Sequence, residues 1–200
     1  MRDYPSQPNV CNRRAIFLDR DGTINIDTHY PHKISDLILL PNSIEGMELL
    51  SSMPFDIIVV SNQGGIALEL YKTEHMSAFN SELKKQIHAN HGRIDAFYYC
   101  PHFELKDKPA EVEMCSCSKP LTGMLTEASN DFEIDLSKSY MVGDRLTDIA
   151  AGNHAGCTTI LISNGSTNTE GIMDIEKPDY IARDLLEVAL IIKDDLLRRE

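Results

Sequence analysis

Two carboxylates stand directly after a short apolar run near the start of the chain. The run Ala15–Leu18 has the length and composition of a buried β-strand, and Asp19 and Asp21 follow it just ahead of Gly22. Such a pair suits either a site for a hard cation or a nucleophile beside an acid–base partner. Taken alone, the pattern equally fits a strand that ends in a polar turn, so the rest of the chain has to decide.

Three later segments offer residues of matching chemistry. Ser61 and Asn62 follow the apolar run 55–60, Lys119 follows a cysteine-rich loop, and Asp144 and Asp148 follow the run 140–142. Because the carboxyl ends of parallel strands meet at one edge of a sheet, we expect most of these groups to converge. Nucleophile, proton carrier, cation ligand and phosphate-binding donors are together what phosphoryl transfer through an aspartyl-phosphate requires. Asp148 could instead act only on the dipole of its helix.

A second group of ligands lies between the predicted third strand and Lys119. Three thiols and one imidazole occur within 18 residues, at Cys100, His102, Cys115 and Cys117. This Cys₃His set is that of a closed tetrahedral zinc site, and the clustering favours a metal over disulfides. Zinc here is therefore expected to be structural and to fix the loop 100–119; iron is the alternative metal. A buried Cys100 with three incidental neighbours would not account for four ligands so close together.

The elements that must position these groups alternate along the chain. Strands are predicted at 15–18, 55–60, 96–99, 140–142, 158–162 and 179–182, and helices at 43–50, 73–90, 122–132, 147–154 and 185–197. Ser43 and Thr122 are expected to cap their helices. The alternation predicts an α/β fold, a three-layer, doubly wound parallel sheet in a single domain spanning 1–200. Residues 1–12 look like a loose lead-in, and no insertion is long enough for a separate cap domain.

The composition limits the partners of the protein. The chain has 200 residues, 42% hydrophobic and 25% charged, as in a soluble globular protein, and no run reaches the length of a membrane span. The polar segment 1–9 lacks the apolar core of a signal peptide, so the cytoplasm is the expected location. The net charge of −12 argues against nucleic acid or an anionic membrane surface as a partner. We expect a monomer that binds a small phosphorylated molecule.

Together the four motifs resemble those of the haloacid dehalogenase (HAD) superfamily of phosphatases. They are Asp19-Arg20-Asp21-Gly22-Thr23, Ser61-Asn62, Lys119, and Gly143-Asp144-Arg145-Leu146-Thr147-Asp148. The resemblance implies that Asp19 is the nucleophile and that Asp21 is first the general acid and then the base. It also implies a catalytic Mg²⁺ held by Asp19, Asp144 and the Asp21 carbonyl. Ser61 and Lys119 would bind the transferring phosphoryl group.

The cysteine loop narrows this resemblance. Its residues, in Tyr98-Tyr99-Cys100-Pro101-His102 and Cys115-x-Cys117-x-Lys119-Pro120, with Gly123-Met124-Leu125, are similar to those of the D-glycero-D-manno-heptose 1,7-bisphosphate 7-phosphatases. That subfamily, which includes the histidinol-phosphate phosphatase domains, implies loss of the 7-phosphate from a heptose bisphosphate on the way to lipopolysaccharide, capsule or nucleotide-activated heptose. The implied substrate contacts are Asp27, Tyr30, Ser61, Asn62, Gln63, Ser118, Lys119 and Arg145.

Two positions depart from the family pattern. Ser118 and Leu68 stand where the family usually has arginine. Losing two guanidinium groups removes bidentate donors for an anion, which affects recognition of a second phosphate more than the chemistry. Histidinol phosphate or another small phosphomonoester therefore remains an alternative substrate, and transfer to an acceptor other than water remains open. A catalytically idle scaffold or regulatory partner is the alternative of another class, and the intact carboxylates and lysine of the motifs argue against it.

Overall fold

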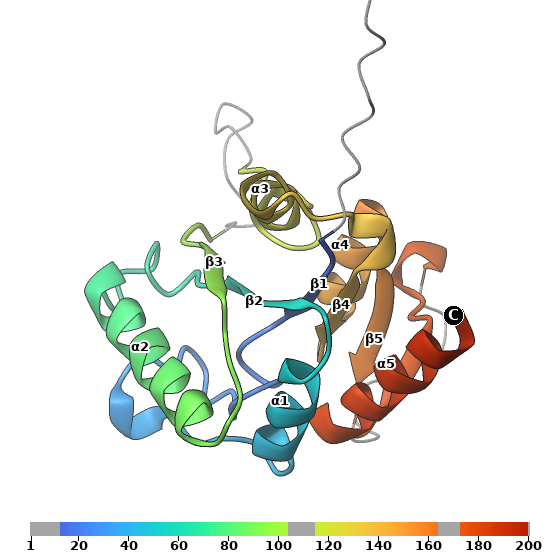
Figure 1. Ribbon diagram of the computed structural model, residues 1–200. Coiled ribbons are helices and arrows are strands. Elements are labelled where there is room, and N and C mark those ends of the chain that lie inside the picture. The colour runs from blue at the N-terminus through green and yellow to red at the C-terminus, as the bar shows by residue number, and fades with distance from the viewer. Residues whose placement is uncertain (1–12, 104–114, 164–172, 200) are drawn as a thin grey trace, which may run out of the picture.

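A parallel β-sheet of six strands lies at the centre of the computed structural model, which describes residues 13–103, 115–163 and 173–199. The strands are β1 (Ala15–Leu18), β2 (Asp56–Asn62), β3 (Ala96–Cys100), β4 (Tyr140–Gly143), β5 (Thr158–Ile162) and β6 (Tyr180–Ala182). Their order across the sheet is β3-β2-β1-β4-β5-β6, and every neighbouring pair is parallel (Figure 1). The predicted doubly wound sheet is confirmed.

Helices cover both faces of this sheet. They are α1 (Ser43–Ser51), α2 (Thr73–Ala89), α3 (Gly123–Phe132), α4 (Leu146–Ala155) and α5 (Leu185–Arg199), with short 3₁₀ helices at Ile34–Asp36, Leu136–Lys138 and Asp174–Glu176. Helices α1, α2 and α5 pack on one face, and α3 and α4 on the other (Figure 1). The described residues form no separate cap domain, as predicted, and contain no helix long and apolar enough to cross a bilayer.

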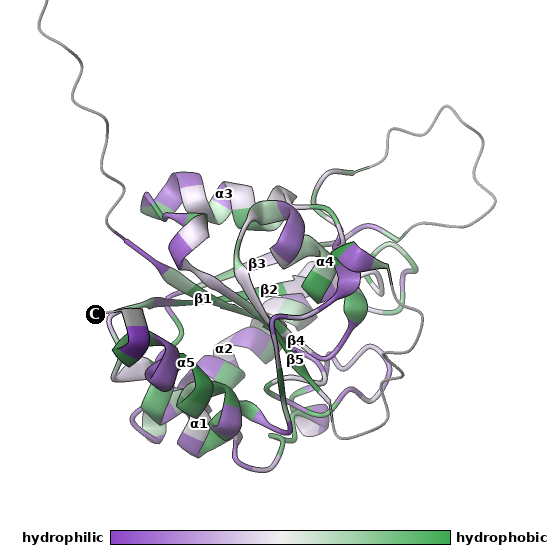
Figure 2. Cartoon of the chain, turned by 90° about the vertical axis from the view of Figure 1, so that its right-hand side faces the viewer, coloured by the Kyte–Doolittle hydropathy of each residue, from purple (hydrophilic) through white to green (hydrophobic). Residues whose placement is uncertain are grey.

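The first strand shows why the sheet is buried on both sides. Ile16 and Leu18 pack into the core below α1, α2 and α5, whereas Ala15 and Phe17 pack below α3 and α4. All four side chains are fully buried, because successive residues of a strand point to opposite faces and both faces carry helices. The strands are accordingly mostly hydrophobic, while the helices carry both hydrophobic and hydrophilic residues (Figure 2).

Some element boundaries differ from the prediction. Strand β2 extends to Asn62 because its pairing with β3 continues to the last residue of that strand, Cys100. The predicted cap at Ser43 was wrong: Asn42, in the left-handed conformation, precedes the helix, and the Ser43 hydroxyl donates instead to the carbonyl of Ile24. Thr122 precedes its helix as predicted, but its side chain makes no capping hydrogen bond.

The order of the strands fixes where a ligand can bind. From β1 the chain moves to β2 and β3 on one side, and then returns to β4 on the other side of β1. In open α/β sheets, ligands bind beyond the carboxyl ends of the strands where the winding direction reverses in this way. The end of β1, followed by Asp19, lies at that point.

Candidate active site

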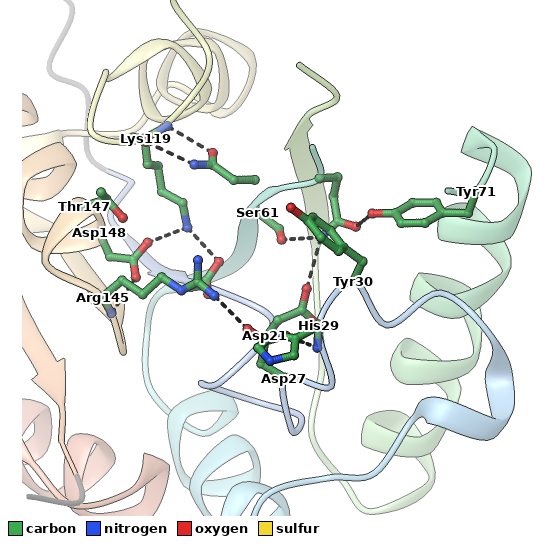
Figure 3. Close-up of a pocket in the computed structure, with 13 residues that line it drawn as sticks. Asp21, Asp27, His29, Tyr30, Ser61, Tyr71, Lys119, Arg145, Thr147 and Asp148 are labelled. Carbon is green, nitrogen blue, oxygen red and sulfur yellow. Dashed lines mark hydrogen bonds and ion pairs between the residues drawn. The ribbon is translucent and has the colours of Figure 1, made fainter. Parts of the chain in front are cut away.

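A cavity of about 290 Å³ opens at the carboxyl ends of the central strands (Figure 3). Nine residues predicted to form the site line it: Asp19, Asp21, Asp27, Tyr30, Ser61, Asn62, Gln63, Lys119 and Arg145. Four further lining residues are His29, Tyr71, Thr147 and Asp148. Asp144 and Ser118 are not among them. Asp144 lines a second cavity with Gly22 and Asp27. Ser118 is half-buried, and its carbonyl accepts a hydrogen bond from the Leu121 amide. Chain segments far apart in the sequence therefore meet at one cavity, as the parallel topology requires.

The loop after β1 is pressed closely against the end of β4. The Asp19 amide donates to the Val142 carbonyl at 2.9 Å, which keeps the residue in line with the sheet. Gly22 has φ +87°, and a Cβ added there would lie 2.2 Å from Oδ2 of Asp144. Glycine is thus required both for the turn and for the close approach, since any side chain would separate this loop from the Asp144 carboxylate.

Lys119 lies between two buried carboxylates. Its Nζ is 2.7 Å from Asp19 Oδ1 and 2.6 Å from Asp148 Oδ1, and it donates to the Val60 carbonyl at 2.8 Å. Burial alone would lower the pKa of the ammonium group, but Asp148 and Asp19 outweigh burial and raise the pKa to about 12. Lys119 is therefore a fixed positive charge at the base of the cavity.

Asn62 holds the backbone of this lysine. Its side-chain Oδ1 accepts from the Lys119 amide and its Nδ2 donates to the Lys119 carbonyl, each at 3.0 Å. Strand β2 thereby grips the segment that carries the ammonium group, although the two residues are 57 positions apart. Asn62 lines the cavity as predicted, but both ends of its amide are already engaged with Lys119.

Three carboxylates form a group that could hold a metal ion. Asp19, Asp144 and Asp148 each offer an oxygen within 4.8 Å of the others. Burial, followed by repulsion from Asp148, raises the pKa of Asp144 to about 6, and burial raises that of Asp19 to about 7 despite the nearby Lys119. Oδ1 of Asp144 is buried without a hydrogen-bond partner. Oxygen ligands, excess negative charge and an unpartnered carboxylate oxygen fit a hard divalent cation.

The sequence left open whether Asp148 belongs to the site or serves only its helix, and in the structure it does both. Its Oδ2 accepts from the Arg145 amide at 3.0 Å, which caps helix α4, and its Oδ1 pairs with Lys119. The side chain is only 1% exposed. A Cβ added at Gly143 would lie 2.2 Å from Oδ2 of Asp148, so the glycine at the end of β4 makes room for this carboxylate.

The mouth of the cavity carries an exposed ion pair. Arg145, at the start of α4, donates to Oδ2 of Asp27 at 2.7 Å, and its side chain is 63% exposed (Figure 3). Asp27 lies on the long connection between β1 and α1. The pair spans the opening between these two segments, with His29 and Tyr30 beside it (Figure 3).

The sequence prediction missed Arg20 and Tyr71. The Arg20 guanidinium binds both oxygens of Asp21, and the Tyr71 hydroxyl donates to Gln63 at 2.7 Å. An arginine between two aspartates, directly after a buried strand, was the one available signal for the first. Tyr71 gave none, because its place depends on how the loop before α2 folds.

The cysteine cluster lies on the loop that leads to Lys119. Sγ of Cys100 is 2.9 Å from that of Cys117 and 3.5 Å from that of Cys115, and Nδ1 of His102 is 3.4 Å from Cys117 Sγ. The thiols are free, and all four ligand atoms lie within 4.8 Å of one another. Zn–S bonds of about 2.3 Å arranged tetrahedrally would separate the sulfurs by roughly 3.8 Å, so the Cys100 and Cys117 sulfurs would move apart on binding a metal. The type, number and closeness of the four ligands fit a closed tetrahedral metal site.

The sheet topology, the strand-end carboxylates and the buried lysine define a phosphatase of the HAD class. A family model described as HAD-hydrolase-like matches residues 116–188. The D-glycero-D-manno-heptose-1,7-bisphosphate 7-phosphatase of Thermosynechococcus vestitus is 37% identical over 86% of this chain and 92% of its own. The D-glycero-beta-D-manno-heptose-1,7-bisphosphate 7-phosphatase of Escherichia coli K12 is 34% identical over 90% and 93%. The chain belongs to this family of heptose-bisphosphate phosphatases.

A solved structure of similar architecture extends the comparison. The D,D-heptose 1,7-bisphosphate phosphatase of B. bronchiseptica, crystallised with magnesium and phosphate, superposes with a TM-score of 0.78 at 28% identity. The match covers 91% of this chain and 99% of that one. The likeness therefore extends over most of both chains rather than a single segment.

Proposed function

We propose that the protein is a Mg²⁺-dependent phosphatase that hydrolyses D-glycero-D-manno-heptose 1,7-bisphosphate to the 1-phosphate. The observation that carries the mechanism is the buried Lys119 between Asp19 and Asp148, at the base of an open cavity beside the unpartnered Asp144 oxygen. The names of the relatives support the substrate. The product would serve the synthesis of nucleotide-activated heptose for lipopolysaccharide or capsule.

In this mechanism the Asp19 carboxylate attacks phosphorus and the bond to the sugar oxygen breaks. Asp21 gives its proton to that oxygen, and Lys119 and Ser61 bind the oxygens of the transferring group. Asp21 then takes a proton from water, which attacks the aspartyl-phosphate and releases inorganic phosphate, so that both residues regain their starting state. Bound Mg²⁺, held by Asp19, Asp144 and the Asp21 carbonyl, would neutralise the phosphate and orient it for in-line attack.

The cysteine cluster is proposed to hold a structural Zn²⁺. Cys100, His102, Cys115 and Cys117 supply all four ligands, so no position remains open for substrate. Lys119 follows the last ligand by two residues. A metal there would fix the segment 117–119 at Cys117, while the hydrogen bonds of Asn62 hold the same segment at Lys119.

Recognition of a second phosphate would depend on Arg145. Among the described residues that line the cavity, Arg145 and the buried Lys119 are the only lysine or arginine side chains. Leu68 and Ser118 supply no charge, and Arg145 is already paired with Asp27. This scarcity of cations favours one alternative, a monophosphate such as histidinol phosphate.

A substrate panel with a matched inactive variant tests the proposal. Phosphate release with Mg²⁺ would be measured on both anomers of heptose 1,7-bisphosphate, on heptose 7-phosphate and on histidinol phosphate, beside Asp19→Asn. Rapid release from one bisphosphate anomer that the variant abolishes is expected. Turnover only of the monophosphates would show that the mechanism is right and the bisphosphate assignment wrong. Equal slow turnover of every substrate would refute the heptose assignment.

The proposal extends to the organisation of the protein. One sheet that contains all six strands of the described residues supports a single domain over 1–200. The net charge of −12 argues against nucleic acid or an anionic membrane surface as a partner. We propose that this domain works as a monomer in the cytoplasm. Light scattering coupled to gel filtration would measure the mass in solution, for which one chain of 22.5 kDa is expected.

A further inference from the structure

Arg20 is a buried cation next to the candidate active site. Its side chain is 1% exposed, and the guanidinium lies 4.4 Å from the centre of the Phe79 ring. NH1 donates to Oδ1 of Asn80 at 2.9 Å, and NH2 donates to the Pro31 carbonyl at 3.1 Å. A buried charge is unfavourable unless it is paired and hydrogen-bonded. The buried guanidinium of Arg20 therefore needs an anionic partner nearby.

That partner is the carboxylate of Asp21. Arg20 Nε donates to Oδ1 at 2.9 Å and NH2 donates to Oδ2 at 2.8 Å, which is a bidentate pair. The Asn25 amide also donates to Oδ1 at 2.9 Å, and the Gln63 amide donates to Oδ2 at 3.2 Å. Asn25 and Gln63 are themselves buried. Each oxygen of Asp21 thus accepts two hydrogen bonds from donors that the fold holds in place.

The same network continues to the phosphate side of the cavity. Nε2 of Gln63 also donates to the Ser61 hydroxyl oxygen at 2.6 Å, and its Oε1 accepts from Tyr71 and from NH2 of Arg20. The orientation of Asp21 is in this way linked to that of Ser61. Arg20 itself does not line the cavity.

We propose that Arg20 is a positioning residue for proton transfer by Asp21. The inference rests on the proposed function, in which Asp21 protonates the leaving oxygen. The rigid fork of the guanidinium fixes both the place and the rotation of the carboxylate, and Asn80 and Phe79 on α2 fix the guanidinium. Lysine would keep the charge but not the fork, so it should not orient Asp21 in the same way.

The test compares two leaving groups. A sugar alkoxide needs a proton to leave, whereas 4-nitrophenolate does not, and kcat/KM reports the steps up to formation of the aspartyl-phosphate. Heptose 7-phosphate and 4-nitrophenyl phosphate would be assayed with the wild type, Arg20→Lys, Asp21→Asn and the exposed control Arg183→Lys. General acid–base catalysis contributes about 10²–10⁴-fold. Arg20→Lys is expected to lower kcat/KM about 10- to 100-fold for the sugar phosphate and less than about 3-fold for the aryl phosphate.

The two variants at the site separate the possible failures. An equal loss on both substrates in Arg20→Lys, with a selective loss in Asp21→Asn, would overturn the positioning role alone. An equal loss in Asp21→Asn would overturn the acid role of Asp21, and the inference with it. If Arg20→Lys does not fold by circular dichroism, Asn80→Ala takes its place, because it removes one hydrogen bond of Arg20 without touching Asp21. In Asn80→Ala, a fall in kcat/KM confined to the sugar phosphate, and smaller than that expected for Arg20→Lys, supports the positioning role. If the ratio of kcat/KM for the two substrates stays at its wild-type value, the positioning role is overturned.

Discussion

Replacing Lys119 by methionine is the most direct way to test the charge balance of the site. Methionine keeps an unbranched apolar chain in the buried position and removes the ammonium group. The ammonium group lies within 2.7 Å of the Asp19 and Asp148 carboxylates and donates to the Val60 carbonyl. Each of these three acceptors would lose a buried donor. Removing one partner of a buried ion pair costs about 3–5 kcal/mol, which for a chain of this length is a loss of about 6–20 °C in Tm.

The same substitution should act on catalysis. Lys119 is proposed to bind the oxygens of the transferring phosphoryl group, and loss of one preorganised donor lowers kcat by about 10²–10³-fold. Thermal and urea unfolding, with Mg²⁺ or with chelator, and phosphate release would be measured on one preparation. The two readouts separate a loss of folded protein from a loss of rate in the folded protein.

An exposed lysine provides the matched control. Lys177 pairs with Asp174 at 2.5 Å, but its side chain is 62% exposed, so Lys177→Met should change stability by less than about 1 kcal/mol. The reasoning is refuted if both variants lose the same small amount of stability, or if Lys119→Met turns over substrate at the wild-type rate.

Three further predictions concern the metals and the mouth. Cys115→Ser should lower Tm and reduce bound zinc, measured by elemental analysis, because metal affinity at such sites contributes to folding; unchanged zinc content would contradict this. Burial raises the pKa of Asp19 to about 7 and that of Asp144 to about 6, from about 4 in the unfolded chain. Without metal, the stability that these carboxyls contribute is present below about pH 4 and lost as pH rises through 6 to 7. Mg²⁺ should therefore raise Tm more at pH 8 than at pH 5, and an equal gain would exclude this site. Asp27→Asn frees Arg145 from its ion pair and should lower the KM for a bisphosphate about 2- to 5-fold relative to that for a monophosphate, because one exposed ion pair is worth about 0–1 kcal/mol. An unchanged ratio of the two KM values would show that Arg145 does not bind the second phosphate.

The fold was predictable because its signals are local and repeated. Runs such as Ala15–Leu18 are apolar throughout, which is typical of strands covered on both faces, and they alternate with amphipathic helices. Parallel connection then brings the carboxyl ends of these strands to one edge. The convergence of Asp19, Lys119 and Asp144 could therefore be expected from the sequence alone.

The finer contacts were not predictable, because they depend on long-range placement of side chains. The bond from the Ser43 hydroxyl to Ile24 and the bond from Arg20 to Asn80 join segments whose relative position the sequence pattern does not define. Asn62 was expected to contact substrate, and the two hydrogen bonds by which its amide holds the Lys119 backbone were not foreseen. Ser118, another expected contact, lies outside the cavity lining because the lysine segment presents its neighbour there.

The grip of Asn62 on Lys119 has a consequence for the evolution of the family. Its side chain imitates one rung of a β-ladder, accepting from one backbone amide and donating to one carbonyl. Aspartate lacks the donor, and glutamine would carry the amide one methylene too far. The pairing is indifferent to which sugar is bound. Relatives that diverge in substrate should therefore keep asparagine at this position while the residues at the mouth, such as Asp27 and Arg145, change.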